Sequence, residues 1–189
     1  MALKITVAPT AEPVTVGEAL AHCRIDHSDD NAMLLRLIAA ARRRVETTLR
    51  RSLMPQTLRL SLDAFPAGAI LLPRPPVTAV TTVAYTDLAG DSQTLADYQL
   101  DTEREPARLL PAYGDCWPGA RDQANAVQVT YQAGYATAEA VPQTIKLAIL
   151  MLVAHWYEHR ESAMDEGKLS ETPQAVEFLL GGERVVRFA

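Results

Sequence analysis

The chain has 189 residues, of which 48% are hydrophobic and 22% charged, a balance that is typical of globular proteins and excludes wholesale disorder. Its formal net charge of −5 excludes a generic basic nucleic-acid binder. The two cysteines, Cys23 and Cys116, are far apart in sequence and imply neither a disulfide framework nor a zinc framework. The N-terminus lacks the pattern of a signal peptide, and the longest apolar run, residues 147–154, is too short to span a bilayer. We therefore expect a cytosolic chain.

The charge is divided unevenly along the sequence. Residues 28–54 contain six arginines and three acidic residues, a local charge of +3, whereas residues 55–140 contain five basic and ten acidic residues, a local charge of −5. Opposite charges on different parts of one chain favour self-assembly or asymmetric docking, because such surfaces attract each other.

The N-terminal helical part, residues 1–54, is predicted to contain two helices. Thr15 followed by Glu18 is the pattern of a capping box, which opens a short first helix. The second helix is expected after Ser28-Asp29-Asp30, where an acidic side chain caps the helix and suits the positive end of its dipole. An apolar stripe recurs along this helix at intervals of three and four residues: Leu34, Ile38, Ala41, Val45 and Leu49.

Arginines crowd the C-terminal half of the second helix. Arg36, Arg43 and Arg50 recur every seven residues, so they line one side of it. One interpretation is a solvated face, and another is a contact surface for an acidic partner or a passing phosphate backbone. No aromatic residues are interleaved, which disfavours stacking on single-stranded nucleic acid. A contact between subunits, with the acidic section of another copy, fits the row at least as well.

The hydrophobic period changes at Pro55, and residues 55–140 are predicted to form an antiparallel β insertion. Leu58, Leu60 and Leu62 alternate with polar residues, as in a half-buried strand. The apolar phase slips near Thr81 and Thr82, which a β-bulge would explain. Other short strands are expected at 69–72, 77–85, around 94, 98–101, 108–110 and 127–131, with a hairpin turn at 88–91 and a long loop at 111–125.

Residues 141–163 are predicted to be the core helix that completes the bundle. Pro142 suits its first turn, and the helix is expected over about 143–161. It is apolar nearly all round through Ala154, so other elements should surround it. Residues 164–189 are interpreted as an extended C-terminal arm, with a polar hinge at 165–168, a short helix over 173–180 and a β-prone tail, Arg184-Val185-Val186-Arg187-Phe188. The predicted class is α+β, with the β insertion between the second and third main helices.

One motif suggests catalysis. The sequence His155-Trp156-Tyr157-Glu158-His159 fits the H-x-x-E-H pattern of zinc hydrolases, in which both histidines bind zinc and the glutamate is the general base. Asp165 or Glu166 is the candidate third ligand. The alternative is that these residues merely end the core helix, because short motifs recur by chance. No phosphate-binding glycine loop or nucleophile elbow is present in the sequence.

Several stretches together resemble a known family. They are residues 16–26, 72–77, 129–135 and 141–160. Their order and spacing are similar to those of the head–tail connector (adaptor) proteins of long-tailed phages, prophages and gene transfer agents, and the resemblance extends from about Val14 to Phe188. Cys23 departs from the pattern, because an aliphatic residue is usual there.

The resemblance implies a structural virion protein without catalytic residues, cofactor or metal. Proteins of this family form a ring that connects the portal vertex of the capsid to the tail and extends the DNA channel. The implied partners are the portal protein, a tail-proximal completion or stopper protein and other copies of the chain, expected as a dodecamer. DNA would pass through without sequence-specific binding, and no membrane is involved.

The resemblance also implies that the C-terminal segment from Leu169 to Phe188, which includes the β-prone tail, reaches the portal. It further implies that the protein resides in the host cytoplasm before it joins the head–tail junction of the virion. Two other functions stay open from the residues alone. One is a zinc-dependent hydrolase using the H-x-x-E-H helix, and the other is a DNA-binding regulator using the arginine row.

Overall fold

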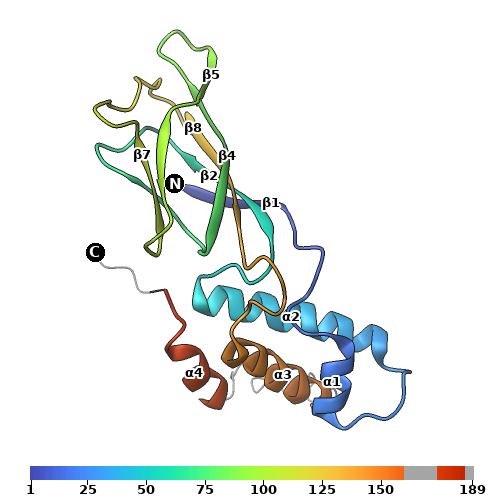
Figure 1. Ribbon diagram of the computed structural model, residues 1–189. Coiled ribbons are helices and arrows are strands. Elements are labelled where there is room, and N and C mark those ends of the chain that lie inside the picture. Colours follow the sequence, from blue (N-terminus) through green and yellow to red (C-terminus); the bar gives the residue numbers. More distant parts are fainter. Residues whose placement is uncertain (160–173, 186–189) are drawn as a thin grey trace. The chain divides into compact units, whose positions relative to one another are not determined.

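The computed structural model describes residues 1–159 and 174–185, which form two compact units (Figure 1). One unit consists of strands and contains residues 1–10 and 54–135. The other consists of helices and contains residues 11–53 and the described residues from 136 to 185. The predicted α+β class is confirmed, with an antiparallel β insertion between helices of one bundle.

The helical unit contains α1 (Val16–Cys23), α2 (Asn31–Leu49), α3 (Gln143–Glu158) and α4 (Gln174–Gly181). The capping box that opens α1 is confirmed: the Glu18 N–H donates to Thr15 Oγ1 at 3.1 Å, and the Thr15 N–H donates to Glu18 Oε2 at 2.6 Å. Two donors that the helix leaves unpaired are thereby satisfied. Within the described ranges, no helix is long and apolar enough to cross a membrane.

Helix α2 buries the stripe predicted for it, since all five apolar positions have no exposed surface. The predicted position of its N-cap is confirmed, because Asp30 is the N-cap residue. The Asp30 side chain, however, makes no capping hydrogen bond. Its carboxylate instead accepts a hydrogen bond from the Tyr157 hydroxyl at 2.5 Å, which joins the start of α2 to the last turn of α3.

Helix α3 begins directly after Pro142 and ends at Glu158, three residues before the predicted end. Helices α1, α2 and α4 all pack against it. The expectation that other elements surround this helix is therefore confirmed, although Leu147 is 42% exposed. The buried face consists of Ile145, Lys146, Ala148, Ile149, Leu152 and Val153.

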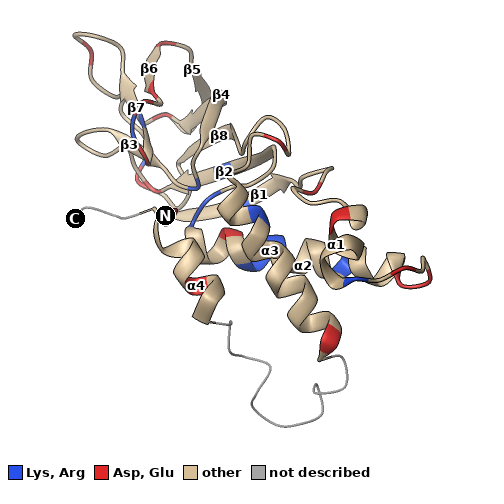
Figure 2. Cartoon of the chain, turned by 60° about the horizontal axis from the view of Figure 1, so that its bottom comes forward, with Lys and Arg blue, Asp and Glu red and all other residues tan. Residues whose placement is uncertain are grey.

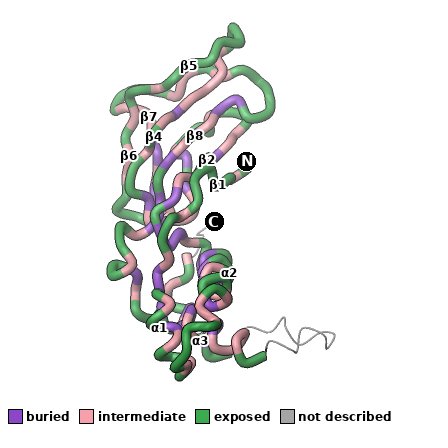
Figure 3. Tube along the Cα trace, turned by 90° about the vertical axis from the view of Figure 1, so that its right-hand side faces the viewer, coloured by how far each residue is buried: buried purple, intermediate pink, exposed green. Residues whose placement is uncertain are grey.

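The β unit contains two antiparallel sheets. The five-stranded sheet has the order β1-β2-β8-β4-β5, and the three-stranded sheet has the order β3-β7-β6. Buried side chains from both sheets form one hydrophobic core, and these buried segments are purple in Figure 3. The strands are β1 (Ala2–Val7), β2 (Gln56–Leu62), β3 (Ile70–Leu72), β4 (Val77–Thr86), β5 (Ser92–Leu95), β6 (Tyr98–Asp101), β7 (Ala107–Pro111) and β8 (Val127–Ala133).

The predicted bulge in the strand rich in valine and threonine is confirmed. The register between β4 and β8 shifts between Val80 and Thr82, and a second shift lies between Val77 and Ala79. The predicted turn is also present between β4 and β5, where Gly90 has a φ of 100° and its N–H donates to the Asp87 carbonyl at 3.1 Å. Glycine adopts that backbone conformation without steric cost, which explains its place in the turn.

Strand β1 is an element that the periodicity did not predict. It pairs with β2 in antiparallel register, with Leu3 opposite Leu60 and Ile5 opposite Leu58. Residues 1–10 therefore belong to the β unit and not with the helices of residues 11–53. Pairing with a strand more than fifty residues away gives these residues their conformation, and local patterns carry little information about such contacts.

Candidate functional site

The arginine row lies on the exposed side of α2. Arg36 and Arg43 are exposed on the helix, and Arg50 is exposed at its C-cap with a φ of 56°. The row therefore faces away from the buried apolar stripe of the same helix. This exposure suits both interpretations of the row, a solvated face and a contact surface.

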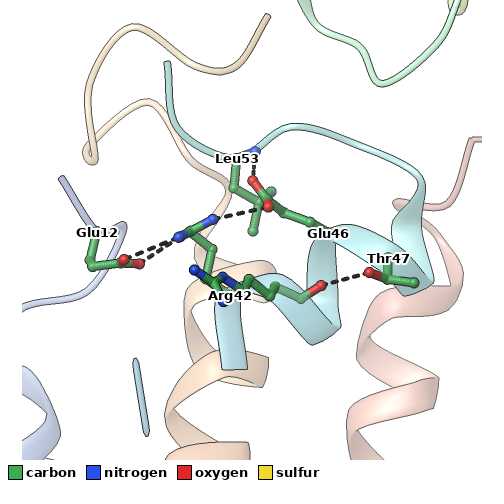
Figure 4. Close-up of polar contacts among 6 residues, drawn as sticks. Glu12, Arg42, Glu46, Thr47 and Leu53 are labelled. Carbon is green, nitrogen blue, oxygen red and sulfur yellow. Dashed lines mark hydrogen bonds and ion pairs between the residues drawn. The ribbon is translucent and has the colours of Figure 1, made fainter. Parts of the chain in front are cut away.

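Arg42, next to the row, has a different role that the sequence did not reveal. Its side chain is buried and binds two carboxylates: Nε donates to Glu12 at 2.7 Å, Nη2 donates to the same carboxylate at 3.2 Å, and Nη1 donates to Glu46 at 3.0 Å (Figure 4). The other oxygen of Glu46 accepts the N–H of Leu53 at 2.9 Å. These bonds join the segment before α1, the body of α2 and the segment after α2.

The charge state of Arg42 follows from these contacts. Burial alone would lower the pKa of its guanidinium, but the hydrogen bonds and negative charges of Glu12 and Glu46 outweigh burial and raise it. Arg42 thus stays charged inside the helical unit and is not available as a surface cation. A buried arginine requires paired acceptors of this kind, because an uncompensated charge in the interior is costly.

The acidic residues of the β insertion lie mainly outside its core. Figure 2 shows them at several loops of the β unit. Asp87 in the β4–β5 turn accepts hydrogen bonds from Gln93 and from the backbone of Asp91 and Gly90, which hold its pKa below the ordinary value. Asp101 in β6 pairs with Arg108 at 2.6 Å. The β unit therefore presents fixed negative charge at its turns.

Trp117 is one of several residues that anchor the long loop after β7. Trp117 stacks on Phe65 with ring centroids 5.0 Å apart, and its Nε1 donates to the Gly68 carbonyl at 2.7 Å. Cys116, beside it, is exposed. Cys23 is half-buried in α1, where burial and then the charge of Glu158 raise the pKa of its thiol.

His155 and His159 lie on the same face of α3, as their spacing predicted, with ring centroids 4.5 Å apart. The ring Nδ1 of His159 lies 2.8 Å from the carbonyl of His155, within the last turn of the helix. The candidate third ligands, Asp165 and Glu166, lie outside the described residues. Among residues 1–159 and 174–185 there is no group of three or more histidine, cysteine or acidic side chains that could hold a metal ion.

The start of the C-terminal tail is bound to the helical unit. The N–H of Val185 donates to the Leu49 carbonyl at 3.2 Å, and Arg51 Nε donates to the Glu183 carbonyl at 2.7 Å. Arg184 between them is exposed. Val186, Arg187 and Phe188 lie outside the described residues. Glu183 and Val185 thus lie at the C-terminal end of α2.

Comparison with known proteins identifies the family. A model of the head completion protein family matches residues 14–172. The chain belongs to the head completion protein family. Its function is that of a structural protein of the head–tail junction, as predicted. No curated protein matches the sequence.

Solved structures agree with this assignment. A chain from the virion of a native gene transfer agent particle is 26% identical, with a TM-score of 0.82 over 100% of this chain and 98% of the other. A chain from the neck of an empty particle, computed with C6 symmetry, is 27% identical with a TM-score of 0.80 over the same shares. A chain from the neck of a native particle, computed with C12 symmetry, is 26% identical with a TM-score of 0.73, again over those shares.

Proposed function

We propose that this head completion protein forms a closed ring of twelve copies between the portal protein and a tail-proximal completion or stopper protein, and that the ring extends the DNA channel. The supporting observation is the full-length likeness to a chain in a particle neck of C12 symmetry. DNA passes through the ring without sequence-specific binding. The role is purely structural, with no catalytic step, and the protein resides in the host cytoplasm until it assembles.

A closed ring built from one kind of subunit needs two different complementary surfaces on each copy. The exposed arginine row of α2 is one candidate, as a contact with the next subunit or with the channel. Arg36, Arg43 and Arg50 are all exposed, and the negative charge of the chain is concentrated in the β insertion. Attraction between these surfaces would guide subunits into one orientation.

The tail from Arg184 to Phe188 is the proposed portal-binding segment. Support comes from the exposed Arg184 and from the backbone bond of Val185 to Leu49, which fixes the start of the tail at the end of α2. Its two valines and one phenylalanine favour an extended segment that adds to the edge of a partner's sheet.

The test combines purified protein with the portal ring and follows the mixture by size-exclusion chromatography with light scattering and by negative-stain imaging. We expect a complex with twelvefold symmetry for the wild-type chain. Deletion of residues 184–189 should abolish binding to the portal without unfolding the protein. The double substitution Arg43→Glu/Arg50→Glu should weaken assembly, whereas Arg104→Glu, an exposed reversal in the β unit, should not. A wild-type chain that ignores the portal at high concentration would refute the proposal.

A further inference from the structure

The outer edge of β1 is an unpaired strand edge with apolar side chains beside it. β1 is the first strand of the five-stranded sheet, and within the described residues only β2 pairs with it. Leu3 packs partly against the core, but Ile5 is 43% exposed and Val7 is 56% exposed. Ile5 lies opposite the buried Leu58, so its side chain belongs to the core face of the sheet at a place where that face is only partly covered. Such an edge is ready to accept another chain.

The same edge carries an unfavourable pair of like charges. Lys4 on β1 lies directly opposite Arg59 on β2, and both side chains are exposed. Neither makes an ion pair within residues 1–159 and 174–185. Like charges placed opposite each other on neighbouring strands destabilise a sheet. An acidic group from outside would relieve this repulsion, so the pair points to an acidic occupant of the edge.

The opposite edge of the sheet has the complementary character. β5 is the last strand, pairs only with β4 among the described strands, and follows a turn that contains Asp87 and Asp91. Asp87 is fixed as a charged group by its hydrogen bonds within the turn. Asp91 is exposed, and Leu88 at the tip of the turn is 76% exposed. The edge therefore has an apolar tip and two acidic residues, which outnumber the Arg121 guanidinium that lies beside Gly90 in the same turn.

We infer that the cationic edge at β1 and β2 binds the acidic β4–β5 hairpin of a second copy, which makes the two edges of the sheet a contact between neighbouring subunits. The inference rests on the proposed ring and names one of its interfaces. All neighbouring strands of this five-stranded sheet are antiparallel, so the direction alternates from strand to strand. The two edge strands, β1 and β5, therefore run in the same direction. Two distinct edges on each copy give a head-to-tail contact, which is the kind that builds rings.

Charge selects this occupant over the other β-prone segment of the chain. The C-terminal tail contains Arg184 and Arg187 and no acidic residue after Glu183, so it would add positive charge to an edge that already has a surplus. The hairpin brings Asp87 and Asp91. Its strand β5 has four residues and β1 has six, so the hairpin fits within the length of the edge.

Complementary charge reversal tests the contact. In Lys4→Glu a glutamate faces Arg59 within the same copy, so the fold should be as stable as in the wild type. Self-association on the portal should nevertheless weaken about tenfold or more. Asp91→Lys should weaken it similarly. The double variant Lys4→Glu/Asp91→Lys should assemble alone, and an equimolar mixture of the two single variants should also assemble, because positions 4 and 91 then carry opposite charges at every contact. Arg104→Glu is the matched control and should assemble normally.

Disulfide trapping provides a readout that does not depend on stable rings. In a Cys116→Ser background, Lys4→Cys/Asp91→Cys should form a ladder of linked copies under mild oxidation, alone at high concentration or with the portal, whereas Lys4→Cys/Arg104→Cys should not. Two results would overturn the edge contact and leave the proposed function standing. One is that both single charge variants assemble as strongly as the wild type. The other is that no ladder of linked copies forms although wild-type rings form on the portal. A wild-type chain that forms neither ring nor portal complex would refute the proposed function itself.

Discussion

Replacing Arg42 by alanine should destabilise the helical unit severely. The substitution removes the cation that Glu12 and Glu46 share, and the Glu46 side chain is only 3% exposed. Glu46 would keep the hydrogen bond from the Leu53 N–H but would lose the charge of Arg42 at a buried position. Breaking a buried ion pair in this way costs about 3–5 kcal/mol of unfolding free energy. For a chain of this length that corresponds to a fall in Tm of about 6–20 °C.

The two tryptophans allow this loss to be measured in the unit concerned. Trp156 lies in α3 of the helical unit and Trp117 in the β unit, and the sequence contains no others. With Trp117 replaced by phenylalanine, urea unfolding followed by tryptophan fluorescence reports on the helical unit alone. The midpoint should fall strongly in Arg42→Ala with the slope unchanged, because stability rather than compactness is altered.

Arg43→Ala is the matched control for this prediction. It removes the same side chain one position along the same helix, but from an exposed site where a substitution changes stability by less than about 0.5 kcal/mol. A loss of under about 1 kcal/mol in Arg42→Ala would show that the cluster contributes little and would refute the reasoning. Equal losses in both variants would point to helix propensity as the cause.

Three further outcomes are expected. Gly134→Ala should lower the free energy of unfolding by about 3 kcal/mol or more, as measured by thermal unfolding, because a φ of 116° is strained for alanine and a Cβ there would overlap a backbone carbonyl. Gly68→Ala is the control and should be close to neutral, because a Cβ at Gly68 would lie in open space. Thr15→Ala should lower the free energy of unfolding by about 1 kcal/mol. The hydrogen bonds of the same capping box lower the pKa of Glu18, so the stabilisation from Glu18 is present above the ordinary glutamate pKa and is lost as the pH falls through the lowered pKa. Glu18→Gln should therefore flatten the acid limb of a pH–stability curve. Tyr131→Phe should cost about 1 kcal/mol in urea unfolding, because the buried hydroxyl donates to a backbone carbonyl at 2.6 Å.

The elements with a clear hydrophobic period were predictable from the sequence. The buried stripe of α2 follows the period of a helix, and β2 and β8 alternate as half-buried strands do. Even the bulge in β4 was predictable, because an extra residue shifts the alternation and leaves a trace in the sequence at Thr81 and Thr82. The capping box at Thr15 is likewise local, since its hydrogen bonds join residues three apart.

Features that depend on distant partners were not predictable. β1 becomes a strand through its pairing with β2, and no local signal distinguishes it from an extended terminus. Arg42 has the same chemistry as Arg43 and Arg44, and only its position beside the buried face, together with the distant Glu12, makes it an interior residue. The exposure of Leu147 depends on which neighbours cover α3, which the composition of that helix does not specify.

These differences change how the uneven charge of the chain should be understood. Arg42 and Glu46 cancel inside the helical unit, so the surplus of residues 28–54 comes from the other arginines, with Arg36, Arg43 and Arg50 exposed. The β unit is acidic in total but has a cationic edge at Lys4 and Arg59. Each unit therefore carries a basic surface, and a subunit has two places to receive an acidic neighbour. Because the surfaces lie in different units, reversals at Arg43 and at Lys4 should weaken assembly additively if the contacts are separate, and less than additively if one acidic turn serves both.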